Sequence, residues 1–183
     1  MLDVADISVS PLVYQDEHDG VKYEAICYPA GNPAGDWSLK NLRLPGDVES
    51  HPTEAERLGR TLAAHGIKRA YAPHVAASSA RIVPKSMLTD VLELPHGVLL
   101  LRNAQLPADG VALGRGEAFI MSGGGGPVIV AAGDGMCIAA HASRESLLDR
   151  YFIRNGRMHA ERKYKSVINA IVGWEARRET GIL

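Results

Sequence analysis

The sequence predicts a single α+β domain that spans all 183 residues. Three observations predict this fold class. Short apolar runs are bounded by glycine-rich turns, which is typical of strands. One segment, Thr53–His65, has the apolar spacing of an amphipathic helix. Hydrophobic residues make up 46% of the chain and aromatic residues only 5%, so we expect a mainly aliphatic core.

The first predicted elements form a hairpin. Ile7–Tyr14 and Val21–Tyr28 have the composition of strands, and the intervening His18-Asp19-Gly20 segment is a hairpin signal. The following segment, Pro29–Asp36, is rich in glycine and proline and is expected to be a loop.

The clearest helix is predicted over Thr53–His65. Thr53 and Glu56 have the spacing of a capping box, and Gly66 stands where a glycine commonly follows a helix. The apolar residues at helical spacing should bury one face; they are Ala55, Leu58, Leu62 and Ala63.

Several short strands are predicted after this helix. Ala70–Val83 is ambiguous, with a short strand at Arg81–Val83, and Gly97–Leu101 is continuously apolar, as in a buried strand. Two further buried strands, Glu117–Met121 and Pro127–Ala132, are separated by the glycine run at 123–126. The next strand, Met136–Ala140, follows a Gly-Asp-Gly turn at 133–135.

Two helices are predicted in the C-terminal part, over Ser143–Tyr151 and Lys165–Arg177, with Ser143 as the N-cap of the first. The richest basic region, Arg150–Lys165, alternates charged with apolar residues, which indicates a solvated helix face.

The charge and composition exclude some classes of function. The formal net charge is −1 and no basic patch is large enough for nucleic-acid binding. No apolar run reaches the roughly 18 residues of a membrane span, and the first residues lack the basic region of a signal peptide. Cys27 and Cys137 form no C-x-x-C motif, which favours a reducing, cytoplasmic setting. The expected partner is a small-molecule substrate, and a homo-oligomer stays open.

His141 is the leading candidate for chemistry. It follows a predicted strand and precedes a predicted helix, beside the glycine run 123–126. Glycines let backbone N–H groups face a ligand, so this run could stabilise an anion. The alternatives are a structural histidine and a plain turn. Cys137 shares a strand face with His141 at roughly 13 Å, which favours a core thiol over a catalytic one.

His74 and His96 are further candidates, each preceded by a proline in a predicted loop. Two imidazoles and one further donor would suffice for a zinc or copper site. A solitary exposed histidine is the alternative for each.

Motifs in the same order along the chain make residues 36–149 resemble the YfiH family, also called laccase-domain proteins or peptidoglycan editing factors. Ser38-Leu39-Lys40-Asn41-Leu42, with Pro45-Gly46-Asp47 after it, resembles S-L-N-L…V-G-D-D. The other matches are P-H-G-V at 95–98 with Q-V-H-G, A-D-G-V at 108–111 with A-D-A-L, P-V-I-V at 127–130 with T-A-D-C-L-P-V-L, and A-H-A at 140–142 with A-H-A-G-W-R-G. The resemblance implies mixed β-sheets in a sandwich flanked by helices, as in the cytotoxic necrotizing factor catalytic domain.

The same resemblance implies a site in which two histidines and one cysteine bind zinc or copper. His141 would be the last ligand, and His96 or His74 the first. The cysteine position falls on Gly125, or on Gly126 with a one-residue shift, so the thiolate is missing and metal binding should be weak. Residues implied to contact substrate are Asn41, Gly124, Gly126 and Arg144. Local replacements for the missing ligand are Cys137, Glu145 and Asp134.

The resemblance departs from the family in two further places. Ser143-Arg144-Glu145-Ser146 replaces G-W-R-G, and the family's C-terminal third is expected to be largely absent. Family members act on purine nucleosides by phosphorolysis and deamination, or oxidise phenols. A metal-dependent enzyme of this kind is the first hypothesis. The alternatives are a degenerate member that serves as a binding or regulatory module, a Gly125 altered from cysteine, and a cysteine-hydrolase-like deamidase.

Overall fold

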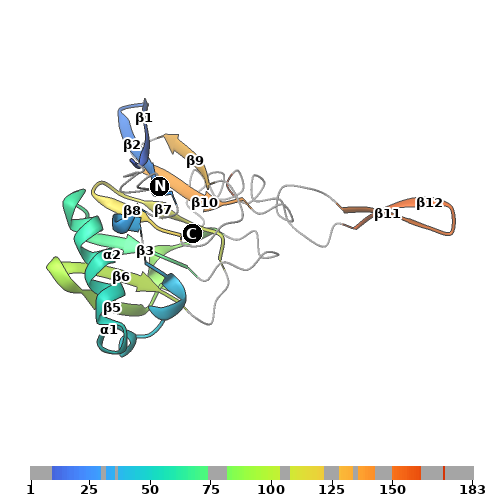
Figure 1. Ribbon diagram of the computed structural model, residues 1–183. Coiled ribbons are helices and arrows are strands. Elements are labelled where there is room, and N and C mark those ends of the chain that lie inside the picture. Colours follow the sequence, from blue (N-terminus) through green and yellow to red (C-terminus); the bar gives the residue numbers. More distant parts are fainter. Residues whose placement is uncertain are drawn as a thin grey trace, which may run out of the picture.

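The computed structural model describes residues 10–29, 32–35, 37–73, 82–103, 108–121, 128–133, 136–142, 150–161 and 171. Over these residues the protein is mixed α+β, with two four-stranded sheets, two hairpins and few helices, as Figure 1 shows. The predicted fold class is confirmed at this level. No helix in the described ranges has the length and apolar character needed to cross a membrane.

The first sheet has the strand order β5-β6-β3-β8. Its strands are β5 (Asp90–Leu94), β6 (Val98–Arg102), β3 (Arg69–Tyr71) and β8 (Glu117–Phe119). Strand β3 runs parallel to β6 and β8, whereas β5 and β6 form an antiparallel hairpin. The predicted strand at 97–101 is thus confirmed with a one-residue shift, and the strand predicted from Glu117 ends two residues early.

Helix α2 (Pro52–Ala64) covers this sheet (Figure 1). The predicted apolar face is confirmed: Ala55, Leu58 and Leu62 are buried in one cluster with residues of β5 and β6, and Ala63 packs against it. Gly66 has a φ of +70° after the helix, as the sequence indicated.

The predicted capping box of α2 is wrong. The N-cap is His51, and its side chain makes no capping hydrogen bond. A short helix, α1 (Asp47–Ser50), leads directly into α2, so Thr53 already lies inside the first turn. Glu56 therefore does not reach back to the backbone; it binds Arg60 and His96 instead.

The second sheet has the strand order β4-β7-β10-β9. Its strands are β4 (Ile82–Val83), β7 (Gly110–Leu113), β10 (Met136–His141) and β9 (Val128–Gly133). Strand β10 is antiparallel to both β7 and β9, and β4 is parallel to β7. The strands predicted at 127–132 and 136–140 are confirmed to within one residue.

The two sheets share a buried cluster. Tyr71 of β3, Val111 of β7 and Ala139 of β10 lie in it, and Phe119 of β8 packs against it. Alternate residues of β10, such as Ile138, belong to a separate cluster on the other face of the second sheet. The two sheets are therefore packed against each other through this cluster.

The N-terminal hairpin consists of β1 (Leu12–His18) and β2 (Val21–Cys27). Its turn is the predicted one: Asp19 and Gly20 both have positive φ, at 49° and 73°, which a two-residue hairpin turn requires. The described strand overlaps the predicted Ile7–Tyr14 range at 12–14 and extends to His18, because pairing from this turn places Leu12 opposite Cys27; residues 7–9 lie outside the described residues.

The C-terminal hairpin corrects a prediction. Arg150 and Tyr151, predicted as the end of a helix, begin β11 (Arg150–Arg154), which pairs with β12 (Arg157–Glu161). The basic region is therefore not a helix face over 150–161. The hairpin extends away from the two large sheets (Figure 1). The rest of the helix predicted over 143–151 lies outside the described residues. Ile171, inside the helix predicted over 165–177, is helical and buried.

Candidate functional site

His141 and Asp109 lie together at one end of the second sheet. His141 is the last residue of β10, and Asp109 immediately precedes β7, which pairs with it. The backbone N–H of His141 donates a hydrogen bond of 2.7 Å to the Asp109 carbonyl oxygen. The imidazole Nδ1 is 4.0 Å from Asp109 Oδ1, so the two side chains face each other.

Both side chains are buried. The Asp109 side chain is 0% exposed and that of His141 is 11% exposed. Nδ1 of His141 makes no hydrogen bond within the described part of the chain, and 4.0 Å is too long for one to Asp109. The two titratable side chains thus form a close, buried pair.

Gly110 allows the two strands to approach each other at this point. A Cβ on Gly110 would lie 2.6 Å from the Ala139 carbonyl oxygen and 2.6 Å from the Ala140 Cβ. Only a residue without a side chain fits between β7 and β10 here. The backbone contact between Asp109 and His141 depends on this close approach.

His96 occupies a different setting. It lies in the turn between β5 and β6 with a φ of +66°, and its Nε2 is 2.9 Å from Glu56 Oε1 on α2. Both side chains are well exposed. The hydrogen bond from His96, followed by that from Arg60, lowers the pKa of Glu56, which indicates a carboxylate engaged in a surface network.

The described donors do not form the metal site that the resemblance implies. His141 faces Asp109, whereas His96 is bound to Glu56 and belongs to the other sheet. Within the described ranges, no group of three or more histidine, cysteine, aspartate or glutamate side chains could hold a metal ion. The zinc or copper expectation therefore gains no support from the described residues, and we derive no step through a metal.

Cys137 has the character of a core thiol, as the sequence predicted. It is half-buried and packs against the cluster shared by the two sheets. Burial raises the pKa of this thiol, which lowers the fraction of thiolate at neutral pH. A nucleophilic cysteine needs the opposite shift, so this environment does not favour Cys137 in the role of the cysteine that the resemblance implies.

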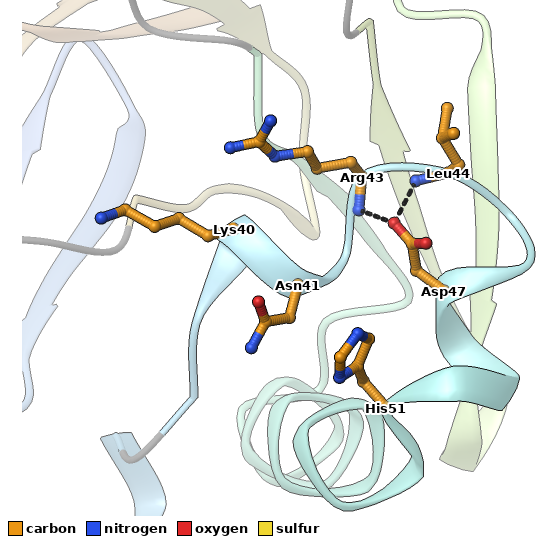
Figure 2. Close-up of a pocket in the computed structure, with 6 residues that line it drawn as sticks. All are labelled: Lys40, Asn41, Arg43, Leu44, Asp47 and His51. Carbon is orange, nitrogen blue, oxygen red and sulfur yellow. Dashed lines mark hydrogen bonds between the residues drawn. The ribbon is translucent and has the colours of Figure 1, made fainter.

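Asn41, expected to contact substrate, lies in an open pocket of about 430 Å³ (Figure 2). Its amide nitrogen donates a hydrogen bond of 3.0 Å to Glu54 Oε1 at the start of α2. The other residues that line this pocket are Lys40, Arg43, Leu44, Asp47 and His51. The interaction with Glu54 gives Asn41 a structural role in joining the loop to the helix.

The other predicted site residues, His74, Gly124, Gly125, Gly126 and Arg144, lie outside the described residues, as do Asp134 and Glu145. Asp109 is the residue that the sequence analysis did not assign to the site. Its signal was a lone acid between Ala108 and the apolar run Gly110–Leu113, where burial would require a partner.

Comparisons with known proteins do not identify this chain. No protein-family model matches it, and neither the curated proteins nor the solved structures gave a significant match. The resemblance to the YfiH family therefore stays a prediction based on motifs.

Proposed function

We propose that this protein is an enzyme that acts on a small molecule, with His141 as its general base and Asp109 as the residue that positions it. The observation that carries the proposal is the buried pair at the end of β7 and β10, with Nδ1 and Oδ1 4.0 Å apart. A carboxylate that faces Nδ1 orients a catalytic histidine, and such contacts are often longer without substrate than in the complex with it.

The proposed role follows from the arrangement of the two side chains. The strand ladder and the hydrogen bond to the Asp109 carbonyl fix the backbone of His141. With Nδ1 facing the carboxylate, Nε2 is the nitrogen that accepts a proton from the substrate or from water. Asp109 then stabilises the imidazolium, because its negative charge is buried beside the positive charge that forms.

The YfiH-like resemblance supplies the finer part of the proposal. We infer a divergent fold of that kind, a sandwich of mixed sheets with helices, and purine nucleosides or phenols as the substrate class. The α+β architecture and the position of His141 at a strand end support this inference. A location in the cytoplasm is part of the same proposal.

A second function is favoured by one specific observation. The resemblance places Gly125 where its members have a cysteine, and glycine has no side chain to coordinate a metal or attack a substrate. The second candidate is therefore a catalytically inactive binding or regulatory module.

The test compares two histidine variants with purine nucleosides plus phosphate, and with a phenol, as substrates. We expect His141→Gln to lower kcat by about 10²–10⁴-fold, because a general base contributes that much. Asp109→Asn should lower kcat less than His141→Gln, since the imidazole remains. His96→Gln should retain turnover, because its partner is Glu56 on the surface.

Two outcomes would contradict the proposal that the protein is an enzyme with His141 as its general base. One is equal loss in His96→Gln and His141→Gln, which would restore the two-histidine site of the resemblance. The other is binding of a nucleoside or phenol by the wild-type protein without turnover of any of them, which would establish the binding module instead.

Metal content provides a separate prediction. We expect zinc and copper in the purified protein to lie well below equimolar amounts by mass spectrometry, because His96 and His141 have different partners. Dialysis against EDTA should leave turnover unchanged. An equimolar, tightly held metal whose removal abolishes turnover would show that residues outside the described ranges complete a metal site.

A further inference from the structure

A cationic pocket lies at the loop that leads into α1, outside the His141–Asp109 pair (Figure 2). Lys40 belongs to the short helix η2 (Leu39–Asn41), Arg43 and Leu44 to the following loop, and Asp47 to the start of α1. His51, between α1 and α2, completes the lining.

The hydrogen bonds that stabilise the backbone of this loop do not involve the side chains of Lys40 and Arg43. Asp47 Oδ2 accepts hydrogen bonds of 2.7 and 2.8 Å from the backbone N–H groups of Arg43 and Leu44. The buried Arg102 guanidinium also donates hydrogen bonds to the carbonyl oxygens of Leu39 and Leu42. The side chains of Lys40 and Arg43 are therefore not needed to form the loop.

These two side chains are also not paired with carboxylates. Within the described part of the chain, neither Lys40 nor Arg43 forms an ion pair. Figure 2 shows their charged ends pointing away from the Asp47 carboxylate. The hydrogen bonds from Leu44 and Arg43 lower the pKa of Asp47, so its charge is already compensated by backbone donors. Glu54, the nearest acid on α2, is bound by Asn41.

A third cation, Arg102, contacts the loop through the carbonyl oxygens of Leu39 and Leu42 and is not part of the pocket lining. Burial lowers the pKa of Arg102, and the charge of Arg43 lowers it further, which indicates that the two guanidinium groups repel each other. Asp47 and Asp90 oppose this effect. An anion bound by Arg43 would offset the repulsion between Arg43 and Arg102, and Lys40 lines the same pocket.

We propose that this pocket binds the phosphate group of a small phosphorylated molecule, with Arg43 and Lys40 as its direct ligands. Arginine forms paired hydrogen bonds with phosphate oxygens, and lysine adds a point charge. Asn41 and His51 lie beside these groups in the lining and would contact the remainder of the ligand. This proposal does not depend on the general-base function of His141.

The test uses isothermal titration calorimetry with inorganic phosphate, ribose 5-phosphate and ribose. We expect ribose 5-phosphate to bind with a Kd on the order of 1 mM or below, inorganic phosphate more weakly, and ribose not at all. The double variant Lys40→Gln/Arg43→Gln should weaken ribose 5-phosphate at least about tenfold, since it removes two charge-assisted contacts.

The matched control is Lys22→Gln/Arg60→Gln, which removes the same two charges from exposed positions on β2 and α2. It should bind ribose 5-phosphate as the wild type does. Equal weakening in both double variants would overturn the proposal, because the effect would then be general electrostatics. So would ribose binding as tightly as its phosphate, or no heat with either phosphate ligand.

Backbone amide resonances give a second measurement that does not depend on any variant. Inorganic phosphate should shift the amide signals of Arg43 and Leu44, which lie at the pocket. Shifts confined to other parts of the chain would place the anion elsewhere and overturn the assignment. Unchanged circular dichroism in both double variants is expected, because no described hydrogen bond of the loop uses the exchanged side chains.

Discussion

Replacing Gly110 with alanine is expected to destabilise the protein by about 3 kcal/mol. The added Cβ would lie 2.6 Å from the Ala139 carbonyl oxygen and 2.8 Å from the Ala140 Cα, and both are backbone atoms of β10. Backbone inside a paired sheet cannot move aside cheaply, because it is held by the ladders to β7 and β9. The measurement is the free energy of unfolding in urea.

The control for this change is Gly46→Ala. Gly46 has an ordinary φ of −67°, and a Cβ there would meet nothing within 4 Å. We expect its effect to stay within about 0.5 kcal/mol, as for other exposed positions without special geometry. Equal effects at the two positions would mean that β7 and β10 do not approach as closely as the structure shows.

The same change also probes the proposed site. Separating β7 from β10 lengthens the hydrogen bond from the His141 N–H to the Asp109 carbonyl oxygen and moves Oδ1 away from Nδ1. We therefore expect the folded Gly110→Ala protein to have a lower kcat than the wild type, in addition to its lower free energy of unfolding. The site and the packing of the second sheet are one structural unit.

The parts of the fold that the sequence predicted well have strong local signals. The Asp19-Gly20 turn fixed the N-terminal hairpin, and the apolar spacing of α2 identified its buried face. The central strand β10 was predicted because it is a continuous apolar run of typical strand length.

The parts that were missed depend on long-range pairing or on a competing signal. Strand β3 has three residues and is stabilised by parallel neighbours distant in sequence. The β11–β12 hairpin was interpreted as a helix because its charges alternate with apolar residues. Its turn, however, is Asn155-Gly156, with φ values of 53° and 70°, and this dipeptide is a strong hairpin signal that outweighs the alternation of charges.

The candidate site could be predicted only in part. His141 was found because strand ends carry functional residues, but its partner Asp109 precedes β7, and 22 residues (114–135) separate β7 from its partner strand β10. No local pattern could show that pairing. His96 was a further candidate ligand, and its exposed contact with Glu56 separates it from His141.

Glu117 is expected to be the carboxylate on which stability depends most. It accepts hydrogen bonds from the Tyr71 hydroxyl at 2.7 Å, the Lys85 ammonium at 2.6 Å and the Gly114 N–H at 2.7 Å. Its side chain is 13% exposed. Glu117→Gln should lower the free energy of unfolding by about 2–3 kcal/mol. The amide removes the negative charge, and its NH₂ group would face a hydrogen-bond donor in place of accepting from it.

The dependence of this cost on pH follows from the sign of the pKa shift. Burial acts to raise the pKa of Glu117, but the hydrogen bonds from Lys85, Gly114 and Tyr71 outweigh it and lower the pKa. A lowered folded-state pKa stabilises the protein above the unfolded value of about 4.3, and this contribution is lost as the pH falls through the folded value. The stability difference between wild type and Glu117→Gln should therefore shrink in acid.

Urea unfolding from about pH 6 down to about pH 3 measures this difference directly. Glu93→Gln on β5 is the matched control, because Glu93 is exposed and makes no ion pair within the described residues. It should change stability by at most about 0.5 kcal/mol across the range. A Glu117→Gln cost that stays constant into acid would show that the carboxylate charge does not stabilise the junction of β3, β8 and the Lys85 turn.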